Sequence, residues 1–130
     1  MSNLKVVLSP DAPSPIGPYS QGVKYQNTLY VSGQIALNPE TNTLIIDSIE
    51  RETRYVLEHI KNIVEKGGSG ISQIIKCSIF VADMNDFAKI NEVYSAFFGE
   101  HQPARETVEV ARLPKDARIE ISCIAACNNE

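Results

Sequence analysis

The segment PARETVEVARLPKDARIEI, residues 103–121, carries Arg105 near its start and Glu120 near its end, two residues that could do chemistry together. The guanidinium of Arg105 offers a planar fork of N–H donors that matches a carboxylate in bidentate fashion. The carboxyl group of Glu120, where it is partly buried, can accept and return a proton as a general base and acid. The two residue types together predict a site for a small carboxylic acid, with water as the co-reactant.

Apolar and polar residues alternate on both sides of a four-residue turn, and this pattern predicts that the segment folds as a β-hairpin. In that register Ala111 pairs with Glu120, and the side chains of Arg105, Thr107 and Glu120 share one face. Arg105 is then six residues from Ala111, which at about 3.3 Å per residue separates it from Glu120 by roughly 20 Å. Side chains cannot close that gap on one small molecule. Either the register is wrong, or Arg105 of one chain meets Glu120 of another in a symmetric oligomer.

Each candidate residue also has an ordinary structural explanation. Arg105 has an acidic neighbour and is equally explained as a surface cation, and Glu120 as a polar residue on the exposed face of a strand. Tyr19 follows a proline-rich loop, where it is either a packed aromatic with a solvated hydroxyl or a partner for substrate or water. Ser32 and Gly33 end a strand, where bare backbone can approach a ligand and where turn geometry also favours glycine.

Hydrophobic spacing predicts the elements that must position these residues. Glycines follow both expected helices, at Gly67 and Gly99. The resulting order predicts a mixed sheet with two helices packed on one face, an α+β domain spanning residues 1–130. The expected elements are strands at 22–26 and 28–33, a hairpin at 35–46, a helix from Ile49 to Val64 capped by Asp47 or Ser48, a strand at 74–82 covered on both faces, a second helix capped by Asn85 or Asp86, and strands at 105–112 and 118–126.

Composition limits the class of protein. The chain has 130 residues and a net charge of −4, so it lacks the basic field that usually drives binding to nucleic acid. No apolar stretch approaches the roughly 20 residues of a membrane helix, and the start lacks the apolar core of a secretory signal. We therefore expect a cytoplasmic protein.

Cysteine and histidine usage argues against a metal or a disulfide. The three cysteines, Cys77, Cys123 and Cys127, are an odd count without C-x-x-C spacing, and we expect them to be small core residues. His59 and His101 have no partner at ligand spacing. The chain also lacks the glycine-rich motifs of nucleotide sites, so no cofactor is expected.

Four blocks in order along the chain resemble the Rid family (also called YjgF) of enamine/imine deaminases, and most closely its RidA branch. They are IGPYSQGV at 16–23, LYVSGQI at 29–35, SIFVADMNDFAKIN at 78–91, and PAR followed by VEVARLPKDARIEI at 103–121. The resemblance covers nearly the whole chain. It implies a chorismate-mutase-like fold and a homotrimer with ligand clefts between its subunits.

The resemblance also implies roles for single residues. Arg105 would hold the substrate carboxylate, Glu120 would activate water, and Tyr19 would help to place water or ligand. The reaction implied is hydrolysis of 2-iminobutanoate and 2-iminopropanoate, and of their enamine tautomers, to 2-oxo acids and ammonia without a cofactor. These substrates arise from pyridoxal-phosphate dehydratases. The remaining residues of the implied cleft are Ser32, Gly33 and Thr107 through their backbone, and Phe87 and Asn91 at its wall.

Two positions depart from the family pattern. Thr107 stands where cysteine is often found, and Glu106 stands where a small residue is usual and could draw the Arg105 guanidinium. Two other functions remain open: an endoribonuclease or translation inhibitor, and a non-enzymatic binder or chaperone-like trimer. The acidic composition and the lack of a histidine pair disfavour the first. The presence of both Arg105 and Glu120 disfavours the second, since a binder needs only the arginine.

Overall fold

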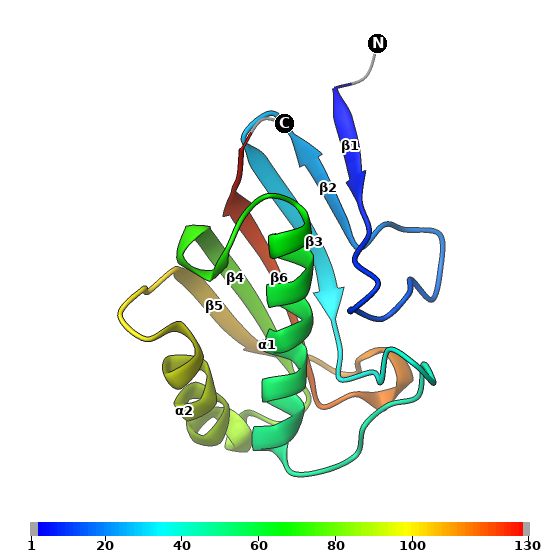
Figure 1. Cartoon of the computed structure of the whole chain (residues 1–130). Helices are drawn as coiled ribbons and strands as arrows, with labels where there is room; N and C mark the ends of the chain where they lie inside the picture. The colour runs from blue at the N-terminus through cyan, green and yellow to red at the C-terminus, as the bar shows by residue number, and fades with distance from the viewer. Residues whose placement is uncertain (1–2, 129–130) are drawn as a thin grey trace.

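Six strands join in one mixed sheet, and two helices cover one of its faces (Figure 1). The computed structural model describes residues 3–128. The strand order is β1-β2-β3-β6-β4-β5, and only β4 and β5 run parallel. The α+β class and the placement of both helices are thus confirmed. The elements are β1 (Leu4–Val7), β2 (Gly22–Tyr25), β3 (Thr28–Gln34), α1 (Ile49–Lys66), β4 (Ile74–Val81), α2 (Phe87–Phe98), β5 (Ala104–Glu109) and β6 (Ile119–Ala126).

Local signals predict both helices well. Ser48 is the N-cap of α1, and its hydroxyl accepts a hydrogen bond from the Arg51 N–H at 3.2 Å. Asp86 is the N-cap residue of α2, one of the two expected, but its side chain makes no capping hydrogen bond. Asp83 instead caps the short 3₁₀ turn that precedes α2, by accepting from the Asn85 N–H at 2.9 Å. Gly99 ends α2 with φ 64°, a conformation that suits glycine.

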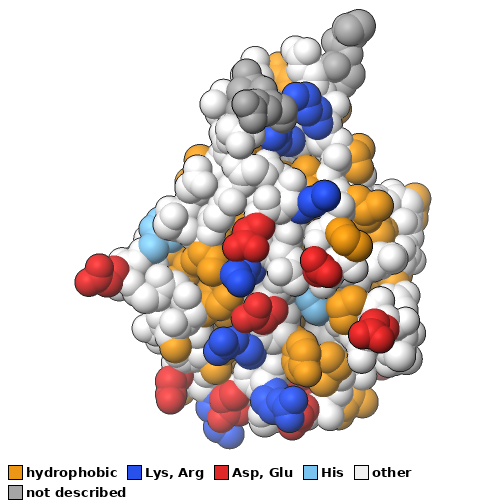
Figure 2. Space-filling model, viewed as in Figure 1, with side chains coloured by type: hydrophobic (Ala, Val, Ile, Leu, Met, Phe, Trp, Pro, Cys, Tyr) orange, Lys and Arg blue, Asp and Glu red, His pale blue; other side chains and the backbone are white. Residues whose placement is uncertain are grey.

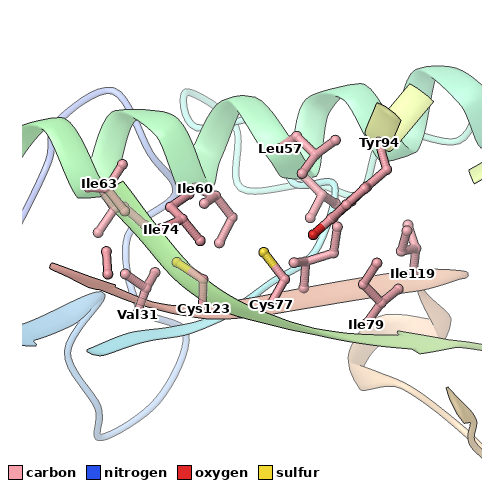
Figure 3. Close-up of a cluster of buried hydrophobic side chains, with 14 of the residues drawn as sticks. Val31, Leu57, Ile60, Ile63, Ile74, Cys77, Ile79, Tyr94, Ile119 and Cys123 are labelled. Carbon is pink, nitrogen blue, oxygen red and sulfur yellow. The ribbon is translucent and has the colours of Figure 1, made fainter. Parts of the chain in front are cut away.

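The core lies between the helices and the sheet face that they cover (Figure 3). Leu57, Ile60 and Ile63 of α1 are fully buried and face side chains of the sheet. The side chains of Cys77 and Cys123 pair across β4 and β6 and point into the same layer. All three cysteines carry free thiols, and all three are buried, as expected for small core residues.

The expected hairpin between the last two strands is wrong. β5 pairs in parallel with β4, and β6 lies between β3 and β4. A parallel pair needs a long crossover, and α2 provides it between β4 and β5. β6 then fills the centre of the sheet, where alternate side chains from Ile119 to Ala125 are buried against the helices. The same period-two pattern fits either pairing, so alternation alone does not select the partner strand.

The true register puts the two candidate residues on opposite faces. Arg105 lies beside Cys77, whose side chain faces the helices, and Thr107 lies beside Ile79 on the same face. Glu120 pairs with Phe80, whose side chain faces away from the helices. We call the side of the sheet away from the helices the open face. The prediction that Arg105, Thr107 and Glu120 share a face is therefore wrong.

Other differences are local. β1 was not expected, and the predicted hairpin at 35–46 is reduced to one bridge between Leu37 and Leu44. β4 is fully covered on one face only, because Ser78 and Phe80 on the open face are half-buried. No helix among residues 3–128 is long and apolar enough to cross a membrane.

An ion pair between the buried Glu52 and the partly exposed Arg118 joins the start of α1 to the residue before β6. Glu52 is 2% exposed, and its carboxylate accepts both the Nε and the Nη2 of Arg118. Arg118 Nη2 also donates to the carbonyl of Asp47, whose own N–H donates to Glu52 at 3.0 Å. The ion pair therefore fixes the segment that leads into Glu120.

We expect Arg118→Ala to lower the free energy of unfolding by about 3 kcal/mol, because it leaves the Glu52 carboxylate buried without its cation. Urea unfolding at one fixed protein concentration measures the effect. The matched control is Arg112→Ala, which breaks an exposed ion pair with Asp116 and should cost less than about 1 kcal/mol. Equal losses in the two variants would contradict this account.

Candidate functional site

A pocket of about 380 Å³ opens beside the last residues of β3 and the first residues of β6. Its polar part contains four of the residues selected from the sequence: Tyr19, Ser32, Gly33 and Glu120. Its apolar wall comes from the proline-rich loop, the segment after β3 and the turn before β6, through Ile16, Ile35, Leu37 and Pro114. The pocket thus combines one carboxyl group with a surface suited to a small, partly apolar molecule.

Glu120 is half-buried at this pocket. Its carboxylate accepts no hydrogen bond from any group in residues 3–128, and burial raises the pKa of its carboxyl above the ordinary 4.5. Desolvation disfavours the charged form, and no cation of the described chain offsets it. A carboxyl group with a raised pKa is a stronger base when ionised, which suits proton transfer near neutral pH.

Gly33 makes room for this carboxylate. A Cβ at Gly33 would lie 2.5 Å from Oε2 and 2.6 Å from Cδ of Glu120. The β3–β6 pairing is irregular between Val31 and Gln34, which places the bare backbone of Gly33 against the glutamate. The sequence suggested that this glycine lets backbone approach a ligand, and in the structure its close neighbour is Glu120.

We expect Gly33→Ala to reduce kcat by roughly 10- to 100-fold in the reaction proposed below, because the new methyl group displaces the Glu120 carboxylate by about 1 Å. The fold should tolerate the change, since the clashing atoms are the end of a flexible side chain. Steady-state kinetics and thermal melting measure the two effects. Gly70→Ala is the control, because its Cβ would meet only Gln73 Oε1 at 3.8 Å. A fully active Gly33→Ala would contradict the tight fit.

Hydrogen bonds tie Ser32 and Tyr19 to the surrounding loop. The Ser32 hydroxyl donates to the carbonyl of Ser20 at 2.6 Å. The Tyr19 hydroxyl accepts from the Ile16 N–H at 3.3 Å and keeps its own proton available for donation. Tyr19 is 46% exposed, so its hydroxyl is accessible from the pocket.

His59 supports the pocket wall from behind. Its Nε2 lies 2.7 Å from the carbonyl oxygen of Leu37, so Nε2 carries the proton. Burial lowers the pKa of His59 below its ordinary 6.5, and the ring is therefore neutral near neutral pH. Its role is to anchor Leu37. Residues 3–128 contain no group of three or more potential metal ligands.

Arg105 lies in a second group, on the other face of the sheet. Its Nη1 donates to Asn91 Oδ1 at 2.8 Å, and its guanidinium carbon lies 4.9 Å from the centre of the Tyr94 ring and 5.6 Å from that of Phe87. These three residues lie on one side of α2, at positions i, i+4 and i+7. They hold the guanidinium by neutral contacts, which leaves its charge without a carboxylate partner among the described residues.

Sequence reasoning selected Phe87 and Asn91 but missed Tyr94 as a contact of Arg105. Tyr94 is also a core residue of α2, since it is 7% exposed. The signal that could have found it is its spacing of three residues from Asn91 on the same helix face. Tyr94 and Asn91 border a second pocket of about 410 Å³ in which Arg105 also lies.

The two departures from the family pattern have clear positions. Glu106 points to the open face, where it binds Lys76 at 3.0 Å and accepts from the hydroxyl of Ser78. The hydrogen bond from Ser78, and to a smaller degree the one from Lys76, lowers the pKa of the Glu106 carboxyl. Glu106 therefore does not draw Arg105 away. The hydroxyl of Thr107 is buried and has no hydrogen-bond partner within residues 3–128.

The structure thus brings the selected residues together in two groups. Tyr19, Ser32, Gly33 and Glu120 meet at one pocket, whereas Arg105, Phe87 and Asn91 meet on the opposite face of the sheet. On the helical face of the molecule, acidic and basic side chains alternate, and that face shows no continuous basic surface (Figure 2).

Comparisons with known proteins agree on the family. The family model described as Endoribonuclease L-PSP matches residues 9–127. The chain is 50% identical over 121 residues to a RutC family protein of Pyrococcus horikoshii, which covers 93% of this chain and 96% of that protein. It is 48% identical over 124 residues to the 2-iminobutanoate/2-iminopropanoate deaminase of Escherichia coli K12, again covering 93% and 96%.

Solved structures show the same fold. E. coli TdcF with bound serine superposes with a TM-score of 0.89 at 45% identity, covering 94% of this chain and 98% of that chain. A putative endoribonuclease from Thermotoga maritima superposes with a TM-score of 0.92 at 46% identity, covering 94% and 96%. The chain therefore belongs to the endoribonuclease L-PSP family, the Rid or YjgF family that its four sequence blocks resemble.

Proposed function

We propose that this protein is a deaminase that hydrolyses 2-iminobutanoate and 2-iminopropanoate, with their enamine tautomers, to 2-oxo acids and ammonia. The observation that carries the proposal is the Glu120 carboxyl, which has a raised pKa and no partner from the described chain in a pocket of small-molecule size. The names of the E. coli and Dermatophagoides farinae relatives, both 2-iminobutanoate/2-iminopropanoate deaminase, support the reaction.

Arg105 is proposed to hold the substrate carboxylate. Its guanidinium is braced by one amide and two aromatic rings, so that the remaining N–H groups can form a bidentate pair with an incoming carboxylate. The TdcF structure contains bound serine, a small molecule with a carboxylate, which supports a clamp of this kind.

The site is proposed to form between subunits of a homotrimer. Within one chain Arg105 and Glu120 face opposite sides of the sheet, so a small substrate cannot reach both. The open face also exposes large apolar side chains, such as Val6 at 70%, Tyr30 at 50% and Val108 at 43%. Exposed apolar surface of this kind supports burial against a second copy of the chain, which would bring Arg105 of one subunit to Glu120 of its neighbour.

The chemistry follows from these roles. The ionised Glu120 carboxylate takes a proton from water as the water oxygen attacks C2 of the imine, and passes that proton to the imine nitrogen to give a carbinolamine with a hydroxyl and an amino group on C2. Glu120 then takes the hydroxyl proton and passes it to the amino nitrogen as the C–N bond breaks, so that ammonia leaves and the hydroxyl oxygen becomes the ketone oxygen. Water and imine give 2-oxo acid and ammonia without oxidation or reduction. Tyr19 is proposed to orient the water or the substrate.

A coupled assay tests the reaction. A threonine dehydratase generates the imine, and the release of 2-oxobutanoate is timed with and without this protein. We expect clear acceleration, and its absence would refute the deaminase function.

Subunit mixing tests the shared site. Arg105→Ala and Glu120→Ala chains are each inactive in this scheme, but trimers refolded from a mixture contain some clefts with both native residues. Activity should therefore reappear on mixing. A mixture that stays inactive despite proven subunit exchange would contradict a site built from two chains.

A further inference from the structure

One buried amide holds the proline-rich loop that leads into the pocket. Gln21 is 1% exposed, and its Oε1 accepts the Ser9 N–H at 2.6 Å. Its Nε2 lies 2.8 Å from the carbonyl oxygen of Pro13, 3.2 Å from that of Ser9 and 3.4 Å from that of Ala12. The side chain thus lies within hydrogen-bond range of four backbone groups of a segment that belongs to no strand or helix.

The loop needs such an anchor because of its sequence. Prolines at 10, 13, 15 and 18 have no N–H to donate, so residues 9–18 cannot form a regular ladder of their own. Asn62 of α1 also donates from its Nδ2 to the carbonyl of Asp11, but this bond is exposed and 3.4 Å long. The buried hydrogen bonds of the loop to the sheet therefore come from Gln21.

Gln21 also connects the two sides of the pocket. Its carbonyl accepts the Ser32 N–H at 2.9 Å, so that the same residue binds the end of β3 and the loop. The loop carries Ile16 and is followed by Tyr19, and both residues line the same pocket as Glu120. A displacement of the loop would change the position of the Tyr19 hydroxyl relative to the Glu120 carboxylate.

We propose that Gln21 is a positioning residue of the site, which holds the loop of residues 9–18 so that Tyr19 is correctly aimed at the reacting group. This inference rests on the proposed function. Gln21 touches no substrate in this scheme and acts through Tyr19. Its amide preorganises the loop before substrate arrives, and small misplacements of a positioning group cost rate.

The test uses Gln21→Met, which keeps the volume of the side chain and removes all four hydrogen bonds. We expect kcat to fall by about 10- to 100-fold, while KM changes by less than about threefold because Arg105 still sets substrate binding. Hydrogen exchange of residues 9–20 should speed up, and that of β4 and α1 should not. Asn62→Ala is the matched control, because it removes the exposed bond to the same loop and should leave kcat near that of the wild type.

A double-mutant cycle with Tyr19→Phe separates positioning from general loosening. If Gln21 acts through Tyr19, the loss caused by Tyr19→Phe shrinks in the Gln21→Met background. The proposal would be overturned if the kcat loss of the double variant equalled the product of the two single losses. It would also be overturned if the kcat of Gln21→Met stayed within twofold of the wild type. A wild type without deaminase activity would refute the proposed function instead. Hydrogen exchange then still decides whether Gln21 fixes the loop, and unchanged exchange refutes that as well.

Discussion

Replacing Glu120 with glutamine is expected to reduce kcat by about 10²- to 10⁴-fold, the usual contribution of a general acid–base residue. Glutamine keeps the shape of the side chain and cannot take a proton from water. The substitution is close to isosteric, so the space beside Gly33 stays filled. The coupled assay with threonine dehydratase measures the loss. A Glu120→Gln variant that retains more than a tenth of wild-type kcat would exclude Glu120 as the base.

The same substitution is expected to raise the stability of the fold at neutral pH. Burial raises the folded-state pKa of Glu120 above 4.5, so the native state binds more protons than the unfolded state between 4.5 and that raised pKa. This contribution to stability is present below pH 4.5 and is lost as the pH rises through the folded pKa. Glutamine does not ionise, so the Glu120→Gln variant does not lose this stability as the pH rises. Thermal melting should therefore show a larger increase in melting temperature over the wild type at pH 7 than at pH 4.

The pKa also sets the acid limb of activity. A base must be ionised to work, so kcat/KM of the wild type should fall on acidification with a midpoint above 4.5. A limb centred at or below 4.5 would show that burial does not set the pKa of Glu120 in the assembled site. The raised stability and the lost activity of Glu120→Gln together would mark a carboxyl group kept for function at the expense of stability.

Replacing Arg105 with alanine is expected to lower kcat/KM, because the substrate carboxylate loses its paired cation. The drop should correspond to a loss of about 2–5 kcal/mol of transition-state stabilisation. Arg105→Lys should recover only part of this loss. Lysine keeps the charge but lacks the planar fork and the stacking on Tyr94 and Phe87. Steady-state kinetics with 2-iminobutanoate measure both variants.

The control for Arg105 is Arg112→Ala, which removes an exposed arginine bound to Asp116. It should leave kcat/KM near that of the wild type. Acceleration retained in Arg105→Ala would remove the carboxylate clamp from the mechanism, whatever the outcome for Glu120. A loss confined to kcat with unchanged KM would instead assign Arg105 to the chemical step.

Local patterns in the sequence were enough for several parts of the fold. The apolar stripe from Ile49 to Val64 with Ser48 and Gly67 at its ends predicted α1, and the strands expected at 22–26 and 28–33 correspond to β2 and β3. These elements depend on contacts between residues that are close in sequence, such as the hydrogen bond from Ser48 to Arg51. The four ordered sequence blocks likewise indicated the family, which the comparisons confirm.

The pairing of the strands depends on contacts between distant residues. Alternation at 104–109 and 119–126 fits a hairpin as well as it fits the observed arrangement, in which β6 enters between β3 and β4. The choice is made by burial, because the central position of β6 covers Ile119, Ile121 and Cys123 with the helices. This pairing places Arg105 and Glu120 on opposite faces of the sheet, and no local sequence pattern predicts the pairing.

The chemical groups of the site were therefore readable from residue types and order, whereas their arrangement was not. Arg105 and Glu120 could be selected because a guanidinium and a carboxyl group have fixed chemistry wherever they lie. Their neighbours could not: the fit of Gly33 against Glu120 and of Tyr94 against Arg105 joins segments that meet only after the sheet and helices have packed. The environment that raises the pKa of Glu120 is a product of that packing.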